Sequence, residues 1–281
     1  MGVRRPCVAG AFYPADPDRL RSSIEGCFTH RLGPGRLPET RSSERDIVSV
    51  VCPHAGYTYS GPVAAHSYHQ LAAEARPESV VVLGPNHTGL GSPIAMMARG
   101  SWETPLGEVE IDEELAGAIF EASHLIDMDN VAHVREHSIE VQLPFLQYVY
   151  GSDVKFVPIC MRLQDLESSR EVGRAVAEAA DGRDVLMVAS TDLNHFEPQS
   201  SAKRKDEMVI ESILSLDEAT LQERVRKNHI SMCGYGPVSA VIVASKRLGT
   251  SEAELLSYHT SGDVTNDYSS VVGYASVKIA R

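Results

Sequence analysis

The chain has 281 residues, a length that supports a substantial buried core and is compatible with one domain or two. Hydrophobic residues make up 43% and charged residues 23%, a composition that is typical of globular proteins and excludes a disordered or fibrous chain. The 38 acidic residues outnumber the 26 basic ones, and the formal net charge of -12 argues against nucleic acid or an anionic membrane as partner.

The cysteines and the N-terminal residues indicate the compartment. An odd set of cysteines without close pairing suits a reducing environment better than a disulfide framework: Cys7, Cys27, Cys52, Cys160 and Cys233. The first residues contain no apolar signal segment, and no stretch approaches the about 18 apolar residues that a membrane span needs. We therefore expect a cytoplasmic protein that keeps its N-terminus.

In the first third of the chain, short β-branched runs alternate with helical periods. Asp16 is expected to cap a helix that ends near His30, and the following residues, 29–45, read as a surface loop. Continuous apolar runs at 47–51 and 79–83 predict buried strands, with a helix from Ser60 toward Ala73 between them. This alternation favours an α/β fold with a mainly parallel central sheet flanked by helices.

The pattern continues to the C-terminus. A hairpin is expected around residues 105–107 within the segment 93–111. Further helices are expected at 112–119, 165–182 and 237–248, and further strands at 154–159, 185–189, 255–259 and 271–279. Because no repeat or composition break divides the chain, we expect residues 1–281 to form a single domain.

Polar side chains stand just beyond three of the predicted strands. His54 follows the first strand, His87 follows the second, and Asp192 and His195 follow the strand at 185–189. Carboxyl ends of parallel strands share one edge of a sheet, where ligands bind, so these side chains are expected to converge. A lone histidine at a strand end is most often structural, but three at equivalent places favour a site.

Imidazole suits iron, zinc or copper, and a further donor is needed to complete a metal site. Cys233 is the best candidate because it lies in a glycine-rich turn just before the helix at 237–248. Backbone N–H groups and the helix dipole at such a place favour a thiolate. The alternative is that Cys233 is a buried, inert cysteine.

Six ordered motifs give the chain a family resemblance. They are PHAGYTYSG (53–61), GPNH (84–87), TPLG (104–107), EHSIE (136–140), STDLNH (190–195) and MCG (232–234). From about Arg5 to the C-terminus, the sequence resembles the MEMO (mediator of cell motility) family. The resemblance implies a fold similar to class III extradiol ring-cleaving dioxygenases, which are non-haem iron enzymes.

The resemblance also implies roles for individual residues. His54, His87 and Cys233 would face a metal, with Fe(II) favoured and copper or zinc as alternatives. A cysteine departs from the two-histidine, one-carboxylate set of the dioxygenases and increases the expected preference for zinc or Cu(I). His195 would act as acid and base, supported by Asp192. The remaining expected pocket residues are Phe12, Tyr13, Tyr59, His137 and Glu140.

The resemblance and these roles lead us to expect a non-haem iron or copper oxidoreductase, similar to the dioxygenases, whose substrate the sequence does not indicate. Two other functions are compatible with the sequence. Residues His133, Glu136 and His137 match the H-x-x-E-H pattern of a zinc metallopeptidase, although no clear helix holds them. The pocket could instead serve a catalytically inactive module that binds a peptide or small molecule, and an oligomer is compatible with either function. The glycines of residues 84–91 lack the order of a nucleotide-binding loop, so no nucleotide cofactor is expected.

Overall fold

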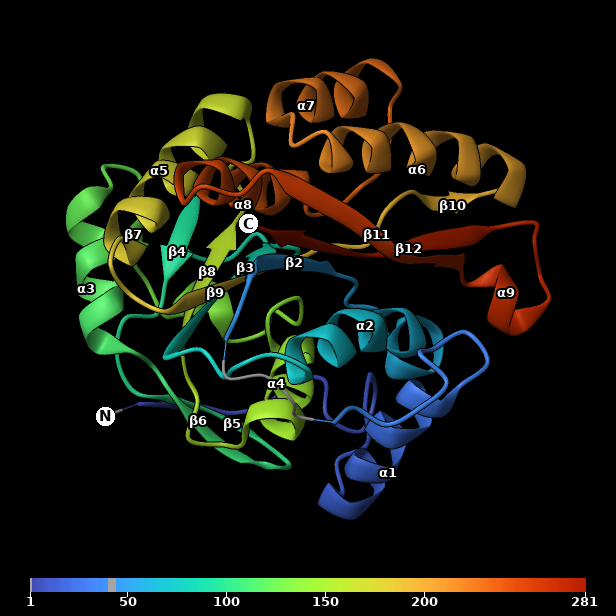
Figure 1. Cartoon of the computed structure of the whole chain (residues 1–281), viewed down its shortest axis with the longest axis horizontal. Coiled ribbons are helices and arrows are strands. Elements are labelled where there is room, and N and C mark those ends of the chain that lie inside the picture. Colours follow the sequence, from blue (N-terminus) through green and yellow to red (C-terminus); the bar gives the residue numbers. More distant parts are fainter. Residues whose placement is uncertain (1, 40–43) are drawn as a thin grey trace.

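A central sheet of nine strands, formed by the predicted apolar runs and the C-terminal strands, organises the molecule (Figure 1). The computed structural model describes residues 2–39 and 44–281. The strand order is β10-β12-β2-β9-β3-β8-β4-β7, and β11 pairs with β12. The sheet strands are β2 (Ile47–Cys52), β3 (Ser79–Pro85), β4 (Ile94–Met96), β7 (Asp127–Met128), β8 (Lys155–Met161), β9 (Val185–Ser190), β10 (His195–Glu197), β11 (Glu252–Thr260) and β12 (Val271–Ala280).

The four central strands are parallel to one another, and antiparallel strands extend the sheet on both sides. β2 pairs with β9, β9 with β3 and β3 with β8 in parallel register, whereas β12 and β4 are antiparallel to their neighbours β2 and β8. Every residue of β2, β3 and β9 is buried, as expected for strands covered on both faces. The predicted α/β fold is confirmed.

Helices cover both faces of this sheet, as Figure 1 shows: α5, α7 and α8 lie above it in that view, and α1, α2 and α4 lie below. The helices of the described residues are α1 (Pro17–Thr29), α2 (Tyr57–Ala72), α3 (Glu113–Ala122), α4 (Leu143–Tyr150), α5 (Leu166–Ala180), α6 (Gln199–Leu214), α7 (Glu218–Lys227), α8 (Tyr235–Arg247) and the short α9 (Gly262–Thr265). Their buried apolar side chains join those of the sheet in one connected core. Among the described residues, no helix combines the length and apolar character needed to cross a bilayer.

Three predicted helix starts are confirmed by their capping bonds. The carboxylates of Asp16, Asp112 and Asp165 each accept a hydrogen bond from a backbone N–H in the first turn of α1, α3 and α5. Such a bond satisfies one of the donors that a helix start leaves unpaired. The predicted hairpin is also present, as β5 (Ser101–Thr104) and β6 (Gly107–Glu110), which join the N-terminal β1 (Val3–Arg4) in a separate sheet.

Some local predictions differ from the structure. The second helix begins at Tyr57, and Ser60 does not cap it, because its hydroxyl donates to the carbonyl of Ala55 at 2.9 Å. Helices α4, α6 and α7 were not predicted. The loop expected at 29–45 is irregular over its described part, and its residues 40–43 lie outside the described residues. All five cysteines are free, as the sequence suggested.

Candidate metal centre

The carboxyl ends of β2, β3 and β9 carry the predicted polar residues to one edge of the sheet. His54 and His87 follow β2 and β3, and their rings lie 5.3 Å apart between centroids. His137 joins them from the turn between two short 3-10 helices, η1 (Val131–His133) and η2 (Glu140–Gln142). Its ring lies 5.4 Å from that of His54 and stacks on that of His87 at 4.7 Å.

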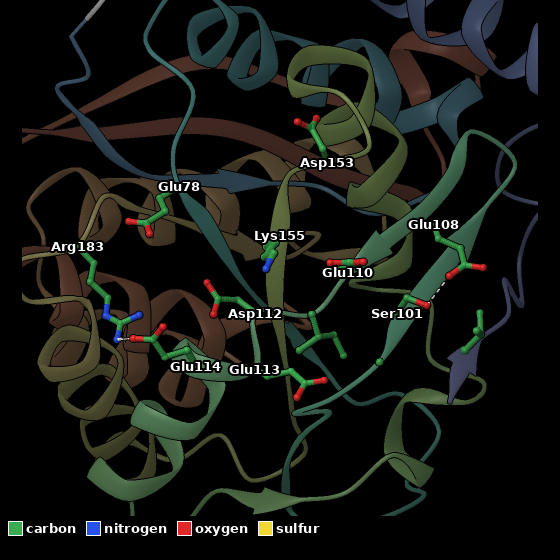
Figure 2. A pocket seen from close by; sticks show the side chains of 13 residues that line it. Glu78, Ser101, Glu108, Glu110, Asp112, Glu113, Glu114, Asp153, Lys155 and Arg183 are labelled. Carbon is green, nitrogen blue, oxygen red and sulfur yellow. Dashed lines mark hydrogen bonds and ion pairs between the residues drawn. The ribbon is translucent and has the colours of Figure 1, made fainter. Parts of the chain in front are cut away.

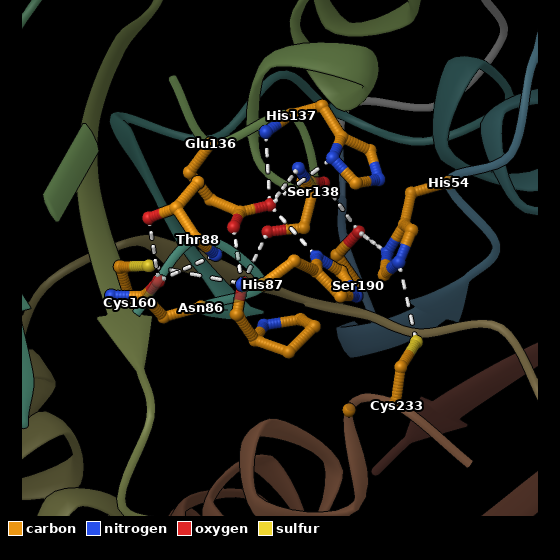
Figure 3. Close-up of polar contacts among 12 residues, drawn as sticks. His54, Asn86, His87, Thr88, Glu136, His137, Ser138, Cys160, Ser190 and Cys233 are labelled. Carbon is orange, nitrogen blue, oxygen red and sulfur yellow. Dashed lines mark hydrogen bonds and ion pairs between the residues drawn. The ribbon is translucent and has the colours of Figure 1, made fainter. Parts of the chain in front are cut away.

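These three histidines form a group that could hold a metal ion (Figure 3). One ring nitrogen from each of His54, His87 and His137 lies within 4.8 Å of the others. His54 is only 1% exposed, whereas the side chain of His87 is 34% exposed and leaves the group accessible from solvent. An ion there would therefore have protein on one side and room for a further ligand on the other.

The hydrogen bonds of Ser190 determine which ring nitrogen of His54 is available. The Ser190 hydroxyl donates to the carbonyl of Ser138 at 2.6 Å and accepts from the side-chain amide of Gln142 at 2.7 Å. Nδ1 of His54 lies 2.9 Å from the same oxygen, which has no second proton to give. Nδ1 of His54 must therefore be the donor, and its Nε2 keeps the lone pair that a metal needs.

Glu136 orients the other two histidines. Its buried carboxylate accepts from the backbone N–H groups of His87, His137 and Ser138, and lies 2.9 Å from Nδ1 of His87. Burial raises the pKa of Glu136, but the hydrogen bond and charge of His87 outweigh it and lower the pKa to about 2. The ionised carboxylate can only accept, so Nδ1 of His87 donates and its Nε2 remains free.

Burial favours the neutral form of two of these histidines, His54 and His137. It lowers the pKa of His54 well below its ordinary value, and the neighbouring His137 and His87 lower it further. Burial likewise lowers the pKa of His137, against the opposing charge of Glu136. Neutral imidazoles can bind a metal without first losing a proton, so the donor set fits a metal ion.

Cys233 borders this group from the turn before α8 (Figure 3). Its Sγ lies 3.3 Å from Nε2 of His54, the nitrogen that the bond to Ser190 leaves free. The backbone N–H of Asp192 donates to the same sulfur at 3.2 Å. Burial and the charge of Asp192 raise the pKa of the Cys233 thiol, so the thiol stays protonated unless an ion stabilises the thiolate.

Asp192 and His195 lie beside the histidines, in the segment that follows β9. The Asp192 carboxylate accepts from the backbone N–H of His54 at 2.8 Å. Burial raises the pKa of Asp192 to about 6, while the bond from His54 and the nearby His195 oppose the rise. Nδ1 of His195 lies 2.8 Å from the carbonyl oxygen of Ser231.

The other expected pocket residues divide into two groups. Phe12 packs its ring 4.9 Å from that of His137, and Tyr59 is 43% exposed on α2. Tyr13 and Glu140 are instead buried and bonded to each other, with the Tyr13 hydroxyl donating to the carboxylate at 2.6 Å. Glu140 also forms a buried ion pair with Arg4. Through Tyr13 and Arg4, Glu140 therefore holds the N-terminal segment against the 3-10 helices.

The proposed peptidase pattern is not built as its chemistry requires. His133 ends η1 and is fully buried, with its ring 5.5 Å from that of Trp102, whereas His137 belongs to the cluster with His54 and His87. No α-helix presents His133 and His137 on one face, and Glu136 is committed to His87 and His137. The metallopeptidase interpretation is therefore corrected: His133 is a core residue that packs against Trp102.

From the sequence, His137 is expected in the pocket or as a zinc ligand of the peptidase pattern, but not as a donor beside His54 and His87. The roles of Ser190 and Glu136 in orienting these rings are not predicted. The motif EHSIE at 136–140 carries a signal that could have found them. A glutamate directly before a histidine, with another histidine at a strand end, is a pattern for an oriented metal ligand.

A separate hollow of about 790 Å³ lies at the opposite, amino ends of β3 and β8 (Figure 2). Figure 2 shows mainly carboxylates around it, with Lys155 among them and Arg183 paired with Glu114. None of the histidines described above lines this hollow. Exposed carboxylates without converging donors do not define a site, so the histidine group remains the candidate centre.

Fold and site together define a class: an α/β protein with a candidate metal centre at the strand ends. Residues 4–278 match the family described as Memo-like protein, and the chain belongs to this family. It is 56% identical to a MEMO1 family protein of Methanopyrus kandleri over 280 residues, covering 99% of both chains. It is 52% identical to one of Methanothermobacter thermautotrophicus, covering 97% of this chain and 99% of the relative.

A solved structure shares the fold. The crystal structure of an uncharacterized protein from Escherichia coli K12 superposes with a TM-score of 0.58, covering 83% of this chain and 99% of the other. The two sequences are 15% identical, so the likeness concerns the fold alone.

Proposed function

We propose that this protein is a non-haem, metal-dependent oxidoreductase of the dioxygenase-like kind, with one ion bound by His54, His87 and His137. The observation that carries the proposal is that one ring nitrogen of His54 and one of His87 are each hydrogen-bonded to a protein group, which leaves the other nitrogen free for an ion. Nδ1 of His54 is committed to Ser190 and Nδ1 of His87 to Glu136, and a ring nitrogen of His137 lies within 4.8 Å of the donors of both. Such second contacts are how proteins orient metal-binding imidazoles.

Cys233 would be the fourth donor. Bond lengths of about 2.3 Å to sulfur and about 2.1 Å to nitrogen separate two tetrahedral donors by roughly 3.5 Å. The observed 3.3 Å between Sγ of Cys233 and Nε2 of His54 is close to that spacing. Bound iron, favoured here, or copper would supply the electron transfer that lets an organic substrate react with O₂.

The protein's own residues would handle protons beside the ion. Nδ1 of His195 is committed to the Ser231 carbonyl oxygen, and Nε2 has no hydrogen-bond partner within the described part of the chain, so Nε2 is the atom that would accept or donate a proton. The Asp192 carboxylate would hold the loop of His54 by accepting from the backbone N–H of His54. Fe(II), or alternatively copper or zinc, is thus proposed as the cofactor, with a small-molecule substrate.

A second candidate is a binding module that uses the same pocket without turnover. The observation that favours it is the half-buried ring of Phe12 beside His137, together with Tyr59, which is 43% exposed at the start of α2, just after the loop of His54. Such side chains suit an apolar group of a peptide or small molecule. In that case, the metal would be structural or absent.

Oxygen uptake distinguishes the two candidates. Anaerobically purified, iron-loaded protein is tested with a panel of catechols, together with His195→Gln and His54→Ala. The oxidoreductase proposal predicts uptake by wild-type protein, loss of at least about tenfold in His195→Gln with the metal retained, and loss of both uptake and metal in His54→Ala. Uptake that is equal in all three proteins would contradict it, and peptide binding without uptake would favour the module.

A further inference from the structure

Ser231 contacts His195 at two points. The backbone N–H of His195 donates to Oγ of Ser231 at 2.7 Å, and Nδ1 of the His195 ring lies 2.8 Å from the Ser231 carbonyl oxygen. A carbonyl oxygen can only accept, so Nδ1 of a neutral His195 must carry the proton. The two contacts therefore set both the position of the residue and the protonated nitrogen of its ring.

Asn194 in turn fixes Ser231. Its side-chain oxygen accepts from the backbone N–H and the hydroxyl of Ser231, each at 3.2 Å. Asn194 is fully buried, and its own backbone N–H donates to the buried carboxylate of Asp206 at 2.8 Å. Since Asp206 also accepts from the hydroxyl of Tyr258 at 2.7 Å, the chain of contacts is anchored in the core beneath α6.

The backbone on the other side of His195 is also constrained. His195 and Glu197 of β10 pair with Val272 and Val271 of β12, and the register shifts between the two pairs. Phe196 lies at this bulge with a φ of 59°, which is rare for a bulky residue. Bulges of this kind re-aim neighbouring side chains and often occur beside active sites.

The position of His195 makes this constraint relevant to the metal centre. A charge on His195 is near enough to oppose protonation of His54 and to favour ionisation of Asp192. Ser231 also lies two residues before Cys233, so one short loop places both the thiol and the ring of His195.

We propose that Ser231, held by Asn194, is a positioning residue that fixes His195 as its Nδ1–H tautomer and reserves Nε2 for proton exchange at the centre. The role of that proton exchange rests on the function proposed above, whereas the tautomer is a property of the protein alone. Without such contacts, a histidine ring in water favours the Nε2–H form, so the constraint reverses the ordinary preference.

The tautomer is read directly by NMR of the full chain labelled with ¹⁵N-histidine, metal-free, at alkaline pH. Comparison with His195→Gln assigns the His195 signals. In the wild type, we expect Nδ1 to show the shift of a protonated nitrogen and Nε2 that of an unprotonated one. In Ser231→Ala, which removes the hydroxyl at an exposed position, the two shifts are expected to move toward each other.

Ser231→Thr keeps the hydroxyl and is expected to retain the wild-type shifts. An Nε2–H pattern in the wild type, or identical shifts in wild type and Ser231→Ala, would overturn the inference. Metal content is measured on the same proteins after loading with Zn²⁺. Wild-type protein that binds no zinc but shows the Nδ1–H pattern would count against the proposed function and support the positioning role.

Discussion

His54 and His87 each have Nδ1 hydrogen-bonded to a protein oxygen that can only accept. Ser190 can only accept from His54, and the Glu136 carboxylate can only accept from His87. Ser190 and Glu136 therefore determine which nitrogen of each ring is left free for an ion.

Glu136→Gln is expected to weaken metal binding by about 10–100-fold, the usual cost of removing such a supporting contact. Glutamine has one acceptor oxygen for the four donors that now face the carboxylate, so His87 loses its orientation. The measurement is a competition titration with a zinc chelator. Glu110→Gln, an exposed change on β6, is the control, and equal affinity in both variants would contradict the assigned role of Glu136.

Asp206 is expected to make stability depend on pH. Burial raises the pKa of Asp206 to about 7, against the opposing bond from Tyr258, so the folded protein holds a proton that the unfolded chain releases near pH 4. Stability from this group is therefore lost as the pH rises from about 4 to about 7.

Asp206→Asn should abolish this loss, because an amide can accept from Asn194 and donate to Tyr258 without carrying a charge. We expect its unfolding free energy to exceed that of the wild type at pH 8 by about 1 kcal/mol or more, with the difference shrinking toward pH 5. Urea unfolding at both pH values measures it. A difference that grows toward pH 5 would contradict the assignment.

The sequence could predict residues whose role follows from position along a strand. His54 and His87 follow apolar runs, and parallel strands bring such ends together, so their convergence was predictable. His137 lies in a turn between 3-10 helices, where no periodic pattern points to a direction. The same limit applies to Ser190, because its role depends on partners from two other segments, His54 and residues 138–142.

At the scale of elements, the short strand β10 combines function with strain. Phe196 is 76% exposed and has a φ of 59°, a conformation that costs a residue with a side chain roughly 1–2 kcal/mol. Its ring lies 5.5 Å from that of His195 but is otherwise open to solvent. The strain is therefore not offset by burial of the ring.

Phe196→Asn is expected to stabilise the protein by about 1 kcal/mol, since asparagine tolerates this conformation and little packing is lost. Thermal unfolding of the metal-free protein measures the change. Phe196→Ala removes the same ring without relieving the backbone and should leave stability nearly unchanged. Equal stabilisation by both substitutions would show that the exposed ring, and not the backbone, is the source.

Elements with a strong periodic pattern were predictable, and elements defined by packing were not. The apolar runs of β2, β3, β8 and β9 are buried at every position except Lys155, and their few polar residues, such as Ser49, do not obscure the pattern. Helix α7 is rich in charge and is buried at only a few positions, so its pattern is weak. Helix α4 carries Pro144 in its first turn, which reads in a sequence as a break although that position tolerates proline.

At the scale of the whole molecule, the site depends on segments far apart in the chain. His54, His87, His137 and Cys233 come from four segments that meet only when the sheet and the 3-10 turns are assembled. Binding of a metal ion there would therefore require the folded state and is expected to stabilise it. The alternation of strands and helices predicts that His54 and His87 meet at one edge of the sheet. The turn that carries His137 is instead held by Arg4, which pairs with Glu140 and donates to the carbonyl of Glu136.

One ion is expected to bind where the rings of His54, His87 and His137 meet. Elemental analysis of protein purified without oxygen tests it most directly, by comparing wild type with His54→Ala and His87→Ala, each checked for folding by circular dichroism. We predict about one metal ion per wild-type chain and a loss of nearly all of it in both variants. Metal content that is the same in all three folded proteins would contradict the account.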